Sequence, residues 1–237
     1  MFIQSKTFIT PQISITRLIK ENPLILLVLE NFGIFHFPKG SSVHQICQKN
    51  HLNESLFIQI CNLHNGYYID HTIEYDISIL SEIIHYLHNS HLYYRQEKYP
   101  EILNDIQKLS QKHNLEILLI IEKYFKEYFH EVNEHIGYEE ETAFPYFRSL
   151  IDKKTAQKSD FSSLTYQEHH TDIESKLNDL KELFIEHVQF TTPNALRRKI
   201  LNDLSELEFE LKVHSQIEDL ILIPLVDRIE KMEGGNG

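Results

Sequence analysis

Apolar residues recur at the spacing of amphipathic helices along four long stretches of the chain. The first stretch begins at Asp76, the second covers Leu115–Glu141, the third begins near Tyr166, and the fourth covers Asn194–Ile223. Polar segments between the stretches allow the chain to turn back, notably within 104–114 and 149–164. Four amphipathic helices with polar connections predict an all-α fold, an up-down four-helix bundle in which the apolar faces meet.

The first part of the chain has a different pattern. Its apolar segments are short, near 14–21, 23–31, 41–50 and 53–64, and proline and glycine residues separate them. Asn53 stands where a helix N-cap is expected. We therefore expect a small helical N-terminal domain over residues 1–70, followed by the bundle over residues 75–232.

Composition and charge narrow the possible partners. The chain has 237 residues with a net charge of −12, which argues against binding to nucleic acid or to an anionic membrane. The start of the chain lacks the pattern of a signal peptide, and the longest apolar run, Leu24–Leu29, is too short to span a membrane. The two cysteines, Cys47 and Cys61, are expected to be buried thiols. These features predict a cytoplasmic protein.

Histidine is unusually common, with 15 residues, and two of the histidines that a glutamate follows four residues later also have a proline ten residues after them. His135 is followed by Glu139, and His214 by Glu218, so that each forms an H-x3-E motif. A spacing of four residues places the imidazole and the carboxylate on one face of a helix, one turn apart. Each motif can therefore present two metal-binding side chains in the same direction.

The two motifs belong to a longer internal repeat with an offset of 79 residues. Each half has a further histidine 44 residues before its motif and a proline ten residues after the histidine of that motif. The paired positions are His91 with His170, His135 with His214, Glu139 with Glu218, and Pro145 with Pro224. In an antiparallel bundle four imidazoles and two carboxylates can share one interior layer. This donor set suits two transition metal ions bridged by the glutamates.

Neighbouring residues compete for some of these positions. His88 lies one helical turn before His91 and is an alternative ligand, although the repeat offset favours His91. His169 is likewise an alternative to His170. The helical spacing of Ile173, Leu177 and Leu180 aligns better with His170. The other acidic residues near the two motifs are expected to form a solvated flank: Glu140, Glu141 and Asp219.

The segments EHIGYEEETAFPYF and VHSQIEDLILIP resemble the hemerythrin-like (HHE) cation-binding superfamily, and the resemblance covers about residues 75–232. More narrowly, the chain resembles the RIC ("repair of iron centres") family. In that family a small helical domain precedes the bundle, and LIKENPLILLVLENFGIFHFPKGSSVHQIC, within about residues 14–65, is similar to it. The family's ligand set corresponds to His91, His135, Glu139, His170, His214 and Glu218.

This resemblance implies two non-haem iron ions as the cofactor. It also implies a bacterial cytoplasmic protein of the nitrosative and oxidative stress response. The implied partners are a small diatomic ligand, NO or O2, and an iron–sulfur protein whose centre is repaired. A homodimer is left open. The motif does not assign a catalytic residue.

One departure from the family concerns the N-terminal domain. Where the family has a Cys-Cys pair before Gly-Gly, this chain has Phe37-Pro38-Lys39-Gly40. The missing thiols favour an alternative function, that of a non-catalytic O2, NO or iron sensor or carrier acting through this domain or a partner. The apolar residues around Phe37 can either form a docking surface or fill the core of the small domain.

Overall fold

The computed structural model describes residues 6–68, 76–151, 162–169 and 173–234, without the side chains of 167–169, 173–175 and 233–234. Over these residues the fold is all-α, and β-structure is limited to one isolated bridge between Ser14 and Ser42. The chain divides into two compact units. One contains residues 1–90, 147–159 and 215–237, and the other contains 91–146 and 160–214.

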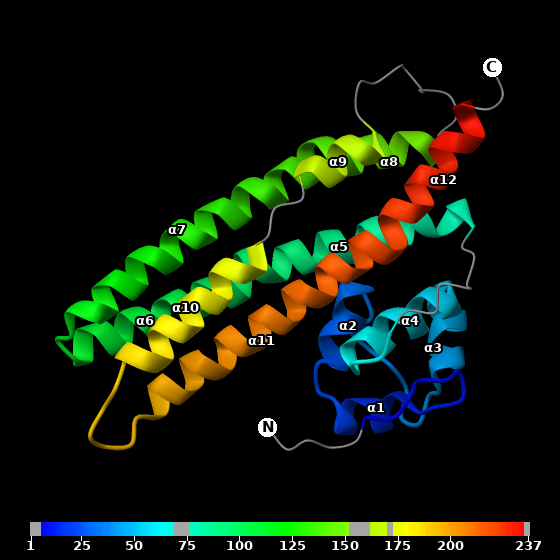
Figure 1. Cartoon of the computed structure of the whole chain (residues 1–237). Coiled ribbons are helices and arrows are strands. Elements are labelled where there is room, and N and C mark those ends of the chain that lie inside the picture. Colours follow the sequence, from blue (N-terminus) through cyan, green and yellow to red (C-terminus); the bar gives the residue numbers. More distant parts are fainter. Residues whose placement is uncertain (1–5, 69–75, 152–161, 170–172, 235–237) are drawn as a thin grey trace. The chain divides into compact units, whose positions relative to one another are not determined.

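Four short helices form the N-terminal part of the first unit, close to their predicted positions (Figure 1). They are α1 (Ile15–Glu21), α2 (Ile25–Asn31), α3 (Val43–Asn50) and α4 (Glu54–His64). Helix α3 begins with a capping box, in which Ser42 and Gln45 bind each other's backbone N–H groups. Helix α4 begins at the predicted cap, since Asn53 accepts a hydrogen bond from the Leu56 N–H.

These helices are attached to the start of the next long helix, α5 (Leu80–Tyr93), which follows the short 3-10 helix η1 (Ile77–Ile79). Asn31 donates a hydrogen bond to the hydroxyl of Ser90 (3.2 Å), and its carbonyl accepts one from Asn89 (2.8 Å). The ring of Phe32 packs on that of Tyr86, with centroids 4.9 Å apart. Residues 80–90 of α5 therefore belong to the same compact unit as the N-terminal helices.

The second unit packs its long helices around one apolar core (Figure 1). These helices are α6 (Tyr99–Lys112), α7 (Glu116–Tyr138), α10 (Ile173–His187) and α11 (Ala195–Ile217). The unit ends at His214, so residues 215–217 of α11 belong to the first unit. The turn between α6 and α7 is shorter than predicted, because α6 continues to Lys112 and leaves only residues 113–115 to reverse the chain. The core residues include Ile106, Leu118, Phe125, Leu180, Phe184 and Leu204.

Three π-turns and three further helices complete the described segments. The π-turns are η2 (Tyr94–Lys98), η3 (Glu139–Ala143) and η4 (Glu218–Leu222). The helices are α8 (Phe144–Ile151), α9 (Ser163–His169) and α12 (Ile223–Gly234). The connection predicted within 149–164 falls mostly on residues 152–161, outside the described residues.

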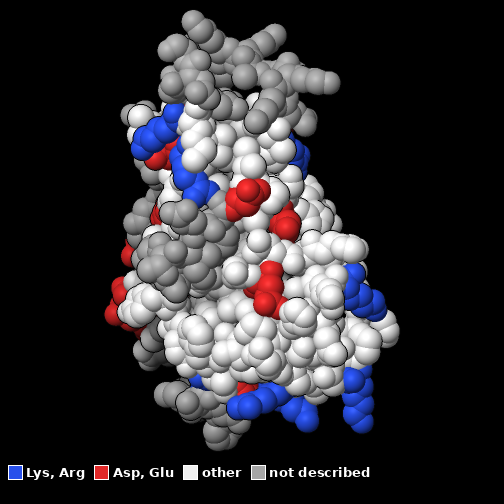
Figure 2. All heavy atoms as spheres, turned by 90° about the vertical axis from the view of Figure 1, so that its right-hand side faces the viewer, with Lys and Arg blue, Asp and Glu red and all other residues white. Residues whose placement is uncertain are grey.

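The described helices all lack an apolar stretch long enough to cross a lipid bilayer. On the face that Figure 2 shows, the described acidic side chains lie in several separate groups among broad uncharged areas. The excess of acidic residues therefore does not gather into a single patch on that face.

Candidate metal centre

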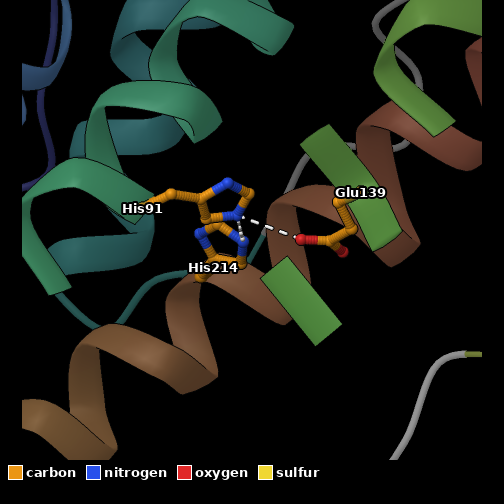
Figure 3. Close-up of side chains that lie close together, drawn as sticks. All are labelled: His91, Glu139 and His214. Atoms are coloured by element: carbon orange, nitrogen blue, oxygen red, sulfur yellow. Dashed lines mark hydrogen bonds and ion pairs between the residues drawn. The ribbon is translucent and has the colours of Figure 1, made fainter. Parts of the chain in front are cut away.

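Three predicted ligands from three separate helical segments converge in the second unit (Figure 3). His91 lies near the end of α5, Glu139 begins η3, and His214 lies near the end of α11. The Nε2 atom of His91 is 3.0 Å from Oε2 of Glu139 and 3.3 Å from Nε2 of His214. All three residues are buried, with relative exposures of 2%, 0% and 7% for His91, Glu139 and His214.

These distances fit a shared metal ion. Two ligand atoms about 2.1 Å from one metal are separated by about 3.0 Å in octahedral geometry and about 3.4 Å in tetrahedral geometry. The N–O and N–N separations at this cluster, 3.0 and 3.3 Å, lie in that range. Imidazole nitrogen and carboxylate oxygen are ligand atoms that bind iron and other transition metals. A buried carboxylate is costly unless charge or hydrogen bonds compensate it, and a metal ion supplies that charge.

The carboxylate of Glu139 lies between two histidines from different helices. Its Oε2 atom faces His91, whereas its Oε1 atom is 3.1 Å from Nε2 of His135. Tyr166 of α9 donates a hydrogen bond to the same Oε1 atom at 2.7 Å. Each oxygen of Glu139 therefore has its own imidazole, which is the arrangement that a carboxylate bridging two metal ions requires.

Helix periodicity explains why His135 and Glu139 meet, but burial makes the pair distinctive. A second H-x3-E pair on α7, His130 and Glu134, has the same spacing, and Nε2 of His130 lies 3.6 Å from Oε1 of Glu134. Its side chains are 75% and 68% exposed, whereas those of His135 and Glu139 are 12% and 0% exposed. The motif therefore occurs on both faces of α7, and only one face turns it toward the interior.

Each π-turn stands just before a proline, which gives a local reason for its position. The N–H of Phe144 binds the carbonyl of Glu139, five residues earlier, and Pro145 follows. The N–H of Ile223 binds the carbonyl of Glu218 in the same way, and Pro224 follows. Proline has no N–H and its ring collides with the carbonyl four residues earlier, so a regular α-turn is disfavoured there. The wider turn accommodates the ring.

The π-turns also place both predicted bridging glutamates in the same local geometry. Glu139 and Glu218 are each the first residue of a π-turn, and both are fully buried. The third π-turn, η2, has the same relation to Pro100 and begins three residues after His91. Widened turns of this kind are frequent at functional sites. The shared proline of the sequence repeat thus has a structural consequence beside each glutamate.

The other predicted ligands have different standing. His91, rather than the alternative His88, meets Glu139 and His214. Glu218 belongs to the first unit, where it begins η4. His170 lies outside the described residues, and the side chain of its alternative His169 is not described either.

Two further residues of the site were not found from the sequence. The expectation that Glu140 belongs to a solvated flank is wrong, because its Oε1 atom lies 2.7 Å from Nδ1 of His91 and its side chain is only 20% exposed. Tyr166, which binds Glu139, appeared only as the start of a predicted helix. The sequence did contain a signal for Glu140: it directly follows Glu139, and Asp219 directly follows Glu218 at the matching position of the repeat.

A second group of acidic side chains in this unit already has a cation. Glu101, Asp105 and Asp203 gather near one another, and the ammonium group of Lys199 lies 2.6, 2.7 and 2.9 Å from their oxygens. Burial works to lower the pKa of Lys199, but hydrogen bonds to these carboxylates outweigh it and raise that pKa. The group is therefore an ion-pair network between helices, with its charge compensated by lysine.

No protein-family model matches the chain, and a search of curated proteins found no match.

Proposed function

We propose that the chain is a non-haem di-iron protein built on an up-down four-helix bundle of the hemerythrin-like type. The proposed ligands are His91, His135, Glu139, His170, His214 and Glu218. The observation that carries the proposal is the carboxylate of Glu139, which is fully buried and presents one oxygen to His91 and the other to His135.

The internal repeat supplies the second half of the centre. Shifting the observed group of His91, Glu139 and His214 by 79 residues, forward for the first two and backward for the third, gives His170, Glu218 and His135. His135 is the histidine that already faces the second oxygen of Glu139. This contact supports the proposed assignment of His135 and His91 to different metal ions.

The resemblance to the RIC family leads us to propose a role in the bacterial cytoplasm under nitrosative or oxidative stress. The centre would act on NO or O2, or supply iron to a damaged iron–sulfur protein. When bound, two ferrous ions would supply the two electrons needed to reduce two NO, with two protons, to N2O and water. His91, Glu139 and His135 would hold these ions, with the buried carboxylate of Glu139 between the two imidazoles.

Metal content tests this proposal directly. Reconstitution of the full chain with ferrous iron under anaerobic conditions should give two irons per chain. The double variant His135→Ala/Glu139→Ala should lose iron from both positions, because the bridge is removed. His130→Ala/Glu134→Ala is the matched control, since it removes the exposed H-x3-E pair of the same helix. Retention of two irons by the first variant would show that the ligand assignment is wrong.

The second candidate is a sensor or carrier, and the attachment of the N-terminal helices favours it. Asn31 binds Ser90, the residue directly before His91, so a partner that moves α2 would act on the helix that carries a ligand. NO consumption by the iron-loaded chain with excess reductant separates the two candidates. Repeated turnover supports the stress enzyme. Stoichiometric binding without turnover, altered by Asn31→Ala, supports the sensor.

A further inference from the structure

The ring of His91 is held on three sides by residues of one helical segment. Oε2 of Glu139 lies 3.0 Å from Nε2, and Oε1 of Glu140 lies 2.7 Å from Nδ1. The ring of Phe144 stacks on the imidazole with an interplanar angle of 1° and centroids 5.6 Å apart. Two consecutive glutamates thus lie beside the two nitrogens of a single histidine.

The contact with Glu140 determines which nitrogen of His91 is available to a metal. An ionised carboxylate can only accept hydrogen bonds, so the Nδ1 atom of His91 carries the hydrogen and donates it to Glu140. The Nε2 atom then remains to bind a metal, and it is the atom that faces Glu139 and His214. A hydrogen bond of this kind also makes the imidazole a better donor.

We propose that Glu140 is a positioning residue of the metal centre, which fixes the orientation and tautomer of His91 and thereby sets the affinity for the metal ion that His91 shares with His214. This inference rests on the proposed function and adds a residue outside its six ligands. Glu140 remains outside the set of ligands, because its carboxylate is bound to the far side of the His91 ring.

The position of Glu140 explains how adjacent residues can serve different purposes. Glu139 is fully buried as the first residue of η3, and Glu140 follows it at the edge of the interior with a side chain 20% exposed. Glu141, the next residue, is exposed. Only the middle of the three carboxylates combines access to solvent with a bond to a ligand. The repeat places Asp219 in the position that corresponds to Glu140.

The test compares two variants of the full chain with a matched control. Glu140→Ala removes the acceptor, Glu140→Gln keeps a carbonyl oxygen that can accept from Nδ1, and Glu141→Ala removes a neighbouring exposed charge. Ferrous iron affinity is measured anaerobically by competition with a chelator. We expect Glu140→Ala to weaken the affinity of one of the two irons by about 10- to 100-fold. We expect a smaller loss for Glu140→Gln and none for Glu141→Ala.

A second readout reports on the hydrogen bond itself. In the Co(II)-loaded chain the paramagnetic ion should shift the NMR signal of the His91 Nδ1–H proton out of the usual range. This proton should exchange slowly with water, and Glu140→Gln should accelerate that exchange. Unfolding of the metal-free Glu140→Ala variant should remain close to that of the wild type, which separates positioning from a general loss of stability.

The outcomes distinguish this inference from the proposed function. A wild-type chain that binds no metal refutes the proposed function, and this inference with it. A wild-type chain that binds two irons, with unchanged affinity in Glu140→Ala, refutes only the role of Glu140. Equal weakening by Glu141→Ala would also refute it, because the effect would then be one of charge alone. If Glu140→Ala does not fold, unchanged proton exchange in Glu140→Gln overturns the assignment.

Discussion

At the scale of single residues, Tyr166 compensates a carboxylate that is fully removed from solvent. Its hydroxyl donates to Oε1 of Glu139 at 2.7 Å, and both groups are buried. Tyr166→Phe leaves the ring in place and removes only this donor. We expect the free energy of unfolding of the metal-free chain to fall by about 1–3 kcal/mol, the usual cost of losing a hydrogen bond to a buried charged group.

Urea unfolding of the metal-free variant measures this loss. Tyr124→Phe is the control, because the Tyr124 hydroxyl makes a long, exposed bond of 3.5 Å to the Lys176 carbonyl. A loss of stability no greater than that of the control would show that Glu139 does not depend on Tyr166.

The two cysteines lead to a prediction about alkaline pH. Burial raises the pKa of the Cys47 thiol to about 12 and also raises that of Cys61. In the unfolded chain both thiols ionise near their ordinary pKa of about 8.5. Because folding favours the protonated thiols, their contribution to stability is complete below about pH 8.5 and is lost as the pH rises above it.

Thiol labelling and alkaline unfolding both check this expectation. At about pH 8 the native chain should react slowly with a thiol reagent, and the urea-unfolded chain should react at both cysteines. Between about pH 8 and pH 10 the wild type should lose more free energy of unfolding than Cys47→Ala/Cys61→Ala. Rapid labelling of the native chain would contradict the burial of these thiols.

At the scale of elements, we expect the π-turn η3 to lower the stability of the metal-free chain and to strengthen metal binding. Pro145 is exposed and follows η3, and a proline inside a helix costs about 3 kcal/mol relative to alanine. Pro145→Ala restores a backbone donor and allows the wide turn to become a regular α-turn. We expect the metal-free variant to be more stable than the wild type by about 1 kcal/mol or more.

The same change should weaken iron binding. Removing a π-turn rotates the residues on one side of it relative to those on the other, so Glu139 and Phe144 can no longer both keep their present contacts with His91. Thermal unfolding and iron affinity are measured on the same variant. A variant that gains stability and still binds iron as tightly as the wild type would show that the π-turn does not position the glutamate.

At the scale of the whole molecule, metal binding should be coupled to folding. The unfolded chain does not hold the ligands together, so each bound ion stabilises the folded state. At a free metal concentration 100 times the dissociation constant, one site adds about 2.7 kcal/mol. The iron-loaded chain should therefore melt at a higher temperature than the metal-free chain.

The difference in melting temperature should shrink in acid. Protons compete with the metal for the imidazole nitrogens, whose ordinary pKa is about 6.5. Calorimetry of both forms between about pH 5 and pH 8 tests this, with the largest difference expected at the upper end. Identical melting of the two forms at every pH would contradict a buried site.

Several elements could be predicted because their signals are local. The cap at Asn53 and the starts and ends of the short N-terminal helices follow from caps, prolines and glycines close in sequence. The turn before α7 was predicted too long, because the polar residues after Asn104 continue α6 on its exposed face. An amphipathic helix and a polar loop differ little where half of the residues face solvent.

The amino-acid sequence alone determined an all-α fold and a repeated set of histidines and glutamates, because helical periodicity and spacing are properties of neighbouring residues. The tertiary structure added that a second pair of the same spacing on α7, His130–Glu134, is exposed, whereas the pair selected by the repeat, His135–Glu139, turns inward. It also decided the partners of His91, because Glu140 and His214 come from distant segments. Long-range contacts depend on how helices pack, and that information lies in the whole core rather than in any one motif.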